Sequence, residues 1–289
     1  MALITLPPRL ESARVVADSV GPDGQRLTTM EVTFWRAVLA EFNTHRVFTR
    51  NSASSRAIPV AKILKRVREN PFLPIWWGAN EAGMSASAEL PSHLVDECIA
   101  VWLEARNDAV KHAERLMEIG LHKQVANRLL EPFMYHTVLV TATDWSNFYA
   151  LRAHKDAQPE IQSPARLMRE AMDASTPQYV DYTSWHLPLV TGVDLEKLQA
   201  EGFSDDDICL ISAGRCARVS YLTHDGVRDP KADITLANRL LASGHMSPLE
   251  HVAQPLTDPA RRVGNFAGWG QYRKLIPNES DFGQARLIA

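Results

Sequence analysis

Apolar and polar residues alternate along two stretches near the start of the chain, 13–20 and 26–34, with the turn-forming residues Gly-Pro-Asp-Gly at 21–24. Alternation is typical of strands with one buried face, so the pattern predicts a β-hairpin. Beyond it, apolar residues recur at three and four positions, which is the period of a helix. This spacing predicts a short helix over 35–42 and a second helix over 60–69.

The longest helical pattern covers 92–119 and stops at Gly120. The stretch 175–207 contains prolines and glycines without a sustained period, so we expect an irregular connection there. The pattern over the tail, 252–289, indicates no obvious helix. The remaining expected elements are a buried strand over 133–142 and helices over 123–130, 144–152, 158–174, 208–220 and 229–242.

The composition is that of a globular protein. Of 289 residues, 45% are apolar and 22% are charged, which excludes disorder, collagen-like repeats or coiled coil as the main architecture. The balance of 31 basic and 34 acidic residues gives a formal net charge of −3. Because proteins that bind nucleic acid normally have a basic excess, we expect no nucleic-acid partner.

The sequence indicates a cytoplasmic protein. No apolar stretch approaches the ~20 residues that span a bilayer, so we expect no membrane partner. The start of the chain lacks the basic segment and apolar core of a secretory signal. The three cysteines form no C-x-x-C pair, which argues against a disulfide framework or a zinc site.

Three segments could carry chemistry. The run Thr44–Arg56 holds three arginines, one histidine and five hydroxyl residues, a set that suits phosphate oxygens or else forms a solvated basic loop. Arg152 lies in an otherwise apolar stretch, where its charge needs either an acidic partner such as Glu160 or a ligand. The third segment joins 217–221 with 244–251, whose two histidines lack the spacing of a helical metal site, so we expect no metal.

Four motifs in these segments resemble the flavin-dependent thymidylate synthases. The family signature R-H-R-x-x-S-x-N-E-x-S-x-R reads T-H-R-x-x-T-x-N-S-x-S-x-R here, from Thr44 to Arg56. The family's A-R-V-S-[YF] is intact at 217–221, and its G-H-x-[ST]-P-F-E-H appears at 244–251 with Leu249 in place of Phe. Its L-R and A-Q-W-E-I segments appear at 151–152 and 157–161, with Pro in place of Trp.

The order of these motifs differs from that of the family, where A-R-V-S-[YF] and G-H-x-[ST]-P-F-E-H precede the arginine-rich run. The resemblance therefore implies a circularly permuted domain of the α+β class, with an antiparallel or mixed sheet packed against long helices. Residues 1–174 would hold the signature and the phosphate- and pyrimidine-binding part, 175–207 the connection, and 208–289 the flavin-pocket segment and tail. Since permutation requires native ends that lie close together, we expect the N-terminal hairpin to contact the C-terminal tail.

The resemblance implies a methyltransferase that converts dUMP to dTMP. The carbon unit would come from methylenetetrahydrofolate and the hydride from FAD that NADPH has reduced. Arg152 and Ser54 are the implied catalytic residues, and Ser54, Arg56, Arg128 and Arg152 the implied substrate contacts. The implied FAD contacts are His45, Arg46, Asn51, Asn147, Ser220, His245, Ser247 and Glu250. Because the family builds its flavin sites between subunits, a homotetramer is also implied.

The chain departs from the family at three positions of the implied site. Thr44 replaces an arginine, Ser52 a glutamate, and Glu41 a glutamine that would face the substrate. One hypothesis is that Gln271, in the tail, supplies a missing substrate contact; the alternative is a basic surface tail. The departures leave two other functions open: a flavin-dependent methylase or hydroxymethylase of another pyrimidine nucleotide such as dCMP, or a degenerate homologue that binds nucleotide without turnover.

Overall fold

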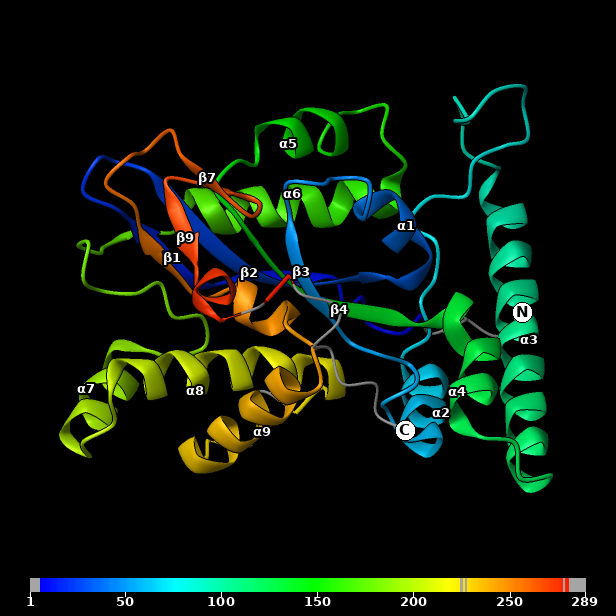
Figure 1. Ribbon diagram of the computed structural model, residues 1–289. Helices are drawn as coiled ribbons and strands as arrows, with labels where there is room; N and C mark the ends of the chain where they lie inside the picture. The colour runs from blue at the N-terminus through cyan, green and yellow to red at the C-terminus, as the bar shows by residue number, and fades with distance from the viewer. Residues whose placement is uncertain (1–5, 224–225, 227, 278, 281–289) are drawn as a thin grey trace.

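The computed structural model describes residues 6–223, 226, 228–277 and 279–280, and within them a mixed sheet lies between two layers of helices (Figure 1). The five strands of this sheet follow the order β3-β4-β2-β1-β5. All neighbours pair antiparallel except β1 and β5, which pair parallel. The α+β class and the mixed sheet are therefore as expected.

The strands of the main sheet are β1 (Ser12–Val20), β2 (Arg26–Trp35), β3 (Thr49–Ser52), β4 (Tyr135–Ala142) and β5 (Gln178–Tyr179). The short strands of the tail are β6 (Ala253–Pro255), β7 (Arg262–Val263), β8 (Phe266–Ala267) and β9 (Trp269–Gln271). The α-helices are α1 (Leu39–Phe42), α2 (Val60–Glu69), α3 (Ser92–Glu118), α4 (Lys123–Ala126), α5 (Ser146–Arg152), α6 (Pro159–Asp173), α7 (Gly192–Ala200), α8 (Asp205–Arg218) and α9 (Pro230–Ala242). The 3-10 helices are η1 (Arg36–Val38), η2 (Asn127–Phe133), η3 (Val219–Tyr221), η4 (Ser247–Glu250) and η5 (Tyr272–Leu275).

Each face of the sheet buries the apolar stripe of a helix. On one face, Ala165 and Met168 of α6 join Val32 and Val140 of the sheet in one buried cluster. On the other face, Leu139 packs with residues of α8 and η3. Figure 1 shows α5 and α6 on one side of the sheet and α7, α8 and α9 on the other. Burial of apolar area on both faces is what holds these layers together.

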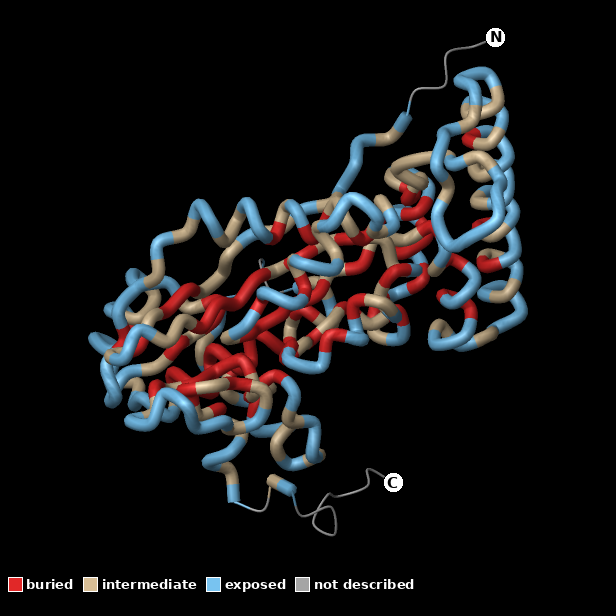
Figure 2. Tube along the Cα trace, turned by 90° about the horizontal axis from the view of Figure 1, so that it is seen from above, coloured by how far each residue is buried: buried red, intermediate tan, exposed pale blue. Residues whose placement is uncertain are grey.

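The helices α2, α3 and α4 form a group beside the end of the sheet. Ile63 and Val67 of α2 pack with Val110 of α3 and with Leu130 and Phe133 of η2. Figure 2 shows that buried residues run along the middle of the molecule, whereas α3 at its margin is mostly exposed. Among the described residues, no helix combines the length and the apolar character needed to cross a bilayer.

The C-terminal tail packs against the N-terminal hairpin, which confirms that expected contact. Gln25, in the hairpin turn, donates a 3.4 Å hydrogen bond from Nε2 to the carbonyl oxygen of Gly268. Leu27 shares a buried cluster with Phe266 and Trp269. The tail as described contains short paired strands and η5, so the expectation of a tail without any helix was wrong for 272–275.

The stretch 175–207 is more regular than we expected, because it contains β5 and the nine-residue helix α7. Thr191 caps α7 by accepting from the main-chain amide of Asp194, while the Asp194 carboxylate accepts from the amide of Thr191. Such a reciprocal capping box satisfies two amides that would otherwise lack partners. The prediction of an irregular connection is corrected accordingly.

A chain of buried hydrogen bonds ties the sheet to the later segments. Ser19 Oγ lies 2.8 Å from Nδ1 of His186, whose Nε2 lies 2.7 Å from Thr29 Oγ1. Thr29 Oγ1 is 2.7 Å from Thr141 Oγ1, which is 2.7 Å from Nδ1 of His251. Burial lowers the pKa of both histidines to about 3, so both rings are neutral at physiological pH. His251 therefore has the structural role that its spacing suggested.

Candidate active site

The arginine-rich run and the two later motifs meet at one pocket of about 490 Å³. Asn51, Ser54 and Arg56 line it from the run, Ser220 from η3, and His245 and Ser247 from the segment after α9. These residues are far apart in the sequence and were expected to converge, and the structure brings this group of them together.

Main-chain and side-chain hydrogen bonds hold the run against the end of α8. The main-chain amide of Ser54 donates a 3.0 Å hydrogen bond to the carbonyl oxygen of Ser220. Asn51 donates from Nδ2 to the carbonyl oxygen of Cys216, in the last turn of α8, at 2.6 Å. The run is thus bonded to the last turn of α8 through Cys216 and to the following η3 through Ser220.

The motif after α9 reaches the pocket through a left-handed turn. Gly244 has φ +74°, a conformation that glycine adopts at little cost, and it ends the helix. The Nδ1 atom of His245 lies 2.9 Å from Ser243 Oγ, which leaves Nε2 for a ligand. His245 and Ser247 are both exposed.

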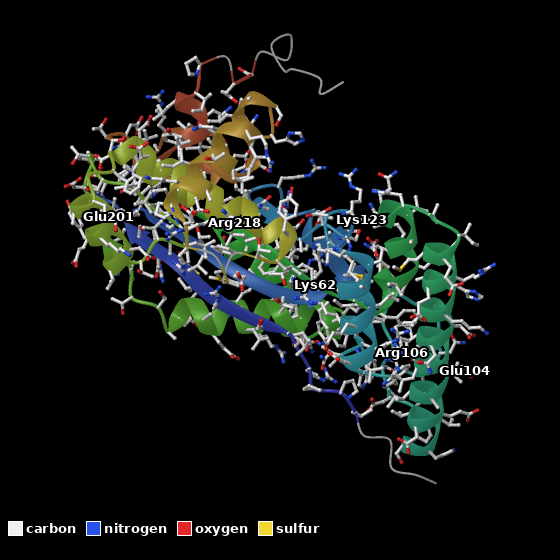
Figure 3. The ribbon with its side chains drawn as sticks, turned by 90° about the horizontal axis from the view of Figure 1, so that it is seen from below. Lys62, Glu104, Arg106, Lys123, Glu201 and Arg218 are labelled. Atoms are coloured by element: carbon white, nitrogen blue, oxygen red, sulfur yellow. The ribbon has the colours of Figure 1, made fainter. Side chains whose placement is uncertain are left out.

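The pocket is positively charged and rich in hydroxyl groups. Arg56 and Lys123 are its cations, and no aspartate or glutamate is among the described residues that line it. Lys123 also donates from Nζ to the carbonyl oxygen of Ala57 at 3.0 Å. Figure 3 shows Lys62, Lys123 and Arg218 in the region where the α8–α9 layer meets the α2–α4 group.

Several hydrogen-bond donors that line the pocket lack a partner. Within the described part of the chain, neither the guanidinium of Arg56 nor the hydroxyls of Ser54, Ser220 and Ser247 has a hydrogen-bond partner. Free guanidinium and hydroxyl donors around one hollow suit the oxygens of a phosphate group. Sequence reasoning missed His122, Lys123 and Gln124 in this wall, for which the only signal was a basic pair at a predicted helix start.

A second group of expected residues gathers around His45, outside this pocket. Arg152 donates from Nε to Nε2 of His45 at 3.1 Å and from Nη2 to Thr44 Oγ1 at 3.4 Å. Burial lowers the pKa of His45, and the charge of Arg152 lowers it further, while a contact with Asn147 opposes the shift. The neutral ring accepts at Nε2, so its proton is on Nδ1. An arginine expected at the pyrimidine thus lies beside two residues expected at FAD.

A third group surrounds Glu250. Arg273 forms an ion pair with the carboxylate of Glu250, and Thr49 donates to it at 3.5 Å. Gln271 is only 2% exposed, and its Nε2 donates to Thr49 Oγ1 at 3.1 Å and to the carbonyl oxygen of Glu250 at 3.3 Å. Gln271 is therefore buried and bonds Thr49 to Glu250, and its contact with substrate stays a prediction.

Three more expected residues lie apart from the pocket. Arg128 donates to Glu131 at 2.7 Å, and the same carboxylate oxygen accepts from Ser55 at 2.7 Å. Arg128 is therefore compensated by Glu131 and does not line the pocket of Arg56 in this chain. Arg46 is exposed, and the Oε2 atom of Glu41 is buried without a hydrogen-bond partner among the described residues.

Residues 26–178 match the family described as thymidylate synthase complementing protein, and this match covers more than half of the chain. The chain therefore belongs to this family, the flavin-dependent one. A search of curated proteins finds no match.

Solved structures show a partial likeness. UMP/dUMP methylase PolB from Streptomyces cacaoi, bound with 5-Br dUMP, is similar at 14% identity and a TM-score of 0.48, over 58% of this chain and 92% of PolB. The same protein bound with 5-Br UMP gives 15% identity and a TM-score of 0.49, over 58% of this chain and 90% of that one. ThyX from Helicobacter pylori, complexed with FAD and dUMP, is similar at 16% identity and a TM-score of 0.36, over 50% of this chain and 67% of ThyX.

Proposed function

We propose that the protein is a flavin-dependent methylase that converts dUMP to dTMP, with methylenetetrahydrofolate as carbon donor and NADPH as the source of electrons. The observation that carries the proposal is the hydrogen bond from the Ser54 amide to the Ser220 carbonyl, which joins the two main motifs of the family at one pocket. The family match supports the class of reaction.

In this proposal Arg56 and Ser54 bind the phosphate of the nucleotide. The planar guanidinium can donate two parallel hydrogen bonds to phosphate oxygens, and the serine hydroxyl adds a third donor. Lys123 adds positive charge from the opposite wall. With no carboxylate among the described lining residues, nothing in this wall repels an anion.

The pocket also fits part of a flavin. The free hydroxyls of Ser220 and Ser247 and the Nε2 atom of His245 can bond the pyrophosphate and ribityl oxygens of FAD. When bound, FAD supplies the hydride that reduces the transferred carbon to a methyl group. A hollow of about 490 Å³ suits one drug-sized ligand, so a nucleotide and a flavin dinucleotide together need additional walls.

We therefore propose that a neighbouring copy completes the site in a homotetramer. The Arg152 group would then face the pocket of another subunit, with Arg152 opposite the pyrimidine ring and His45 and Asn147 beside the flavin. A fixed cation of this kind would stabilise negative charge that develops on the ring when C5 becomes nucleophilic. Arg46 and Glu250 would extend the flavin contacts, and Arg128 would join the phosphate once released from Glu131.

A second candidate substrate is a cytosine nucleotide such as dCMP, because of Glu41. Its buried Oε2 has no partner in the described part of the chain, and it stands where the family has glutamine. A carboxylate accepts but cannot donate, whereas the glutamine amide does both. Such an acceptor favours the 4-amino group of cytosine over the 4-oxo group of uracil.

We also propose that the chain is circularly permuted. The contact between the hairpin and the tail and the convergence of 217–221 and 244–251 on the arginine-rich run support this proposal. The family match ends at residue 178, before both of those motifs, as expected if they moved to the C-terminal side.

The test follows tritium release from C5-labelled dUMP and, in parallel, C5-labelled dCMP. We expect FAD uptake by the purified protein and release from one nucleotide when the donor and NADPH are present. Arg56→Gln should weaken binding of that nucleotide about tenfold or more, whereas Lys65→Gln, on the exposed face of α2, should not. If the protein took up no FAD and released tritium from neither substrate, the result would instead favour a homologue that binds nucleotide without turnover.

A further inference from the structure

A second, more enclosed cavity of about 330 Å³ lies between the sheet and α2, on the other side of the arginine-rich run from the candidate active site. Thr33 and Arg36 line it from the end of β2, His136 from β4, and Arg66 from α2. Leu10 and Arg66 are exposed and mark the side that opens to solvent. A cavity of this size is at the lower end of the range for small-molecule sites.

His136 is a buried polar group that lacks a partner in this wall. The side chain is 4% exposed, and its Nε2 atom has no hydrogen-bond partner in the described part of the chain. Burial, with a smaller effect of Arg36, lowers its pKa to about 3, so the ring is neutral and can donate or accept one hydrogen bond. Several buried polar atoms of the described residues lack a partner, and that of His136 belongs to a residue that lines a cavity able to hold one.

The cavity carries positive charge without an acid to balance it. Arg36 and Arg66 line it, and no aspartate or glutamate is among its described lining residues. Burial alone lowers the pKa of Arg66, which has no ion pair within the described residues. Arg36 is partly compensated, because its Nη2 lies 3.7 Å from Glu131. The same Glu131 oxygen also pairs with Arg128 at 2.7 Å, so the two arginines of the cavity have little acidic compensation and favour an anionic ligand.

Most of the remaining wall is apolar. Its apolar side chains include Ala53, Ile58, Ile63, Val67, Phe133 and Leu222, and Asn70 and Tyr135 add two polar ones. The hydroxyls of Thr33 and Thr137 bond each other at 3.0 Å, and Ser55 bonds Glu131, so these groups are already satisfied. Arg36, Arg66 and His136 are the basic groups of the lining, and the apolar part of the surface favours a hydrocarbon body.

From this arrangement we propose that the cavity is a binding site for a small organic monocarboxylate, with the carboxylate held by Arg36, Arg66 and His136 and an apolar body against the α2 side. The site is separate from the pocket of Ser54 and Arg56. It stands on geometry that does not depend on the proposed methylase activity.

The test titrates the full-length protein with benzoate by calorimetry, with benzyl alcohol and inorganic phosphate as comparison probes. We expect benzoate to bind, and neither of the other two to bind as tightly. Arg66→Gln should weaken benzoate binding about tenfold or more, because a charged hydrogen bond is lost. Arg68→Gln is the matched control, since Arg68 is on the same helix but pairs with Glu114 outside the cavity.

His136→Leu separates a binding role from a structural one. Replacing an unpaired buried imidazole by an apolar side chain should leave the folded protein at least as stable, yet weaken benzoate binding. Equal affinity for benzoate and benzyl alcohol, tighter binding of phosphate, or equal effects of Arg66→Gln and Arg68→Gln would each overturn the proposal. Nucleotide binding measured on the same variants should be unchanged, so failure here is distinguishable from failure of the methylase proposal.

Discussion

The Oδ1 atom of Asp233 accepts a 2.6 Å hydrogen bond from Nε of Arg218, the arginine of the A-R-V-S-Y motif. Asp233 is fully buried, and its Oδ2 also accepts from Arg215 at 3.3 Å. Arg218 is therefore held by α9 rather than presented to a ligand. This pair fixes the crossing of α8 and α9, on which one wall of the candidate active site is built.

Replacing Asp233 by asparagine should destabilise the protein by about 3–5 kcal/mol, because Arg218 loses this buried carboxylate and Arg215 is left with Asp194 alone. Chemical denaturation followed by circular dichroism measures the change. Glu196→Gln, on the exposed face of α7, is the control and should shift the free energy of unfolding by less than about 0.5 kcal/mol. An Asp233→Asn variant as stable as the control would contradict the bracing role.

Gly214 is needed for the same crossing. A Cβ atom there would lie 2.4 Å from the carbonyl oxygen of Asp233, which is main chain and cannot move alone. Gly214→Ala should therefore cost about 1–3 kcal/mol or more. Gly192→Ala is the matched control, since a Cβ at Gly192 has no atom within 4 Å and should be neutral or slightly stabilising. Thermal unfolding of both variants compares the two sites directly.

Arg152→Gln should lower turnover by roughly 10²–10³-fold with FAD binding retained, if Arg152 stabilises charge on the pyrimidine. The exposed Arg166→Gln on α6 controls for the loss of one positive charge. Single-turnover kinetics separate the chemical step from binding. An Arg152→Gln enzyme that bound nucleotide weakly but turned over at the normal maximal rate would assign Arg152 to binding alone.

Stability should fall as the pH is lowered below about 6.5. His136, His186 and His251 have folded-state pKa values of about 3, below the value of the unfolded chain. The unfolded chain therefore binds more protons between these limits, and each histidine removes about 1.4 kcal/mol of stability per pH unit. Denaturant midpoints at several pH values from about 7.5 to 5.5 measure the slope.

The contribution of one histidine to this dependence of stability on pH can be removed selectively. His136→Leu should reduce the pH dependence by about one proton, whereas His154→Gln, which changes an exposed histidine, should leave it unchanged. A His136→Leu variant with the wild-type slope would show that His136 does not bind its proton upon unfolding in this range.

Local sequence patterns were sufficient to predict the strands and helices that bury a continuous stripe of apolar residues. The hairpin, α2 and α3 begin and end within a few residues of their predicted limits, because alternation and helical spacing reflect burial directly. The helix expected over 123–130 is α4 followed by η2, which contains Pro132. The helix α7 was missed because its apolar residues Val193, Leu195 and Leu198 do not follow a sustained helical period, although Thr191 and Asp194 gave a capping signal. Strands of two or three residues such as β7 and β8 are too short to show a period and depend on distant partners.

The motifs were sufficient to bring Ser54, Arg56, Ser220 and His245 to one pocket. They could not show that Arg152 bonds His45, or that Gln271 is buried beneath Glu250, because these contacts join residues that only the tertiary fold brings together. The compensation of Arg128 did have a local signal, because Glu131 lies three residues further along the chain, whereas Arg56 has no acid at that spacing.

The buried chain from Ser19 to His251 also constrains when the protein can mature during synthesis. Its first member is made more than two hundred residues before its last, and Thr29 and Thr141 each need a partner supplied by a later segment. Until residue 251 has left the ribosome, the sheet would expose polar atoms that water must occupy. A nascent polypeptide halted before that point would therefore remain unfinished even with all five strands of the main sheet present.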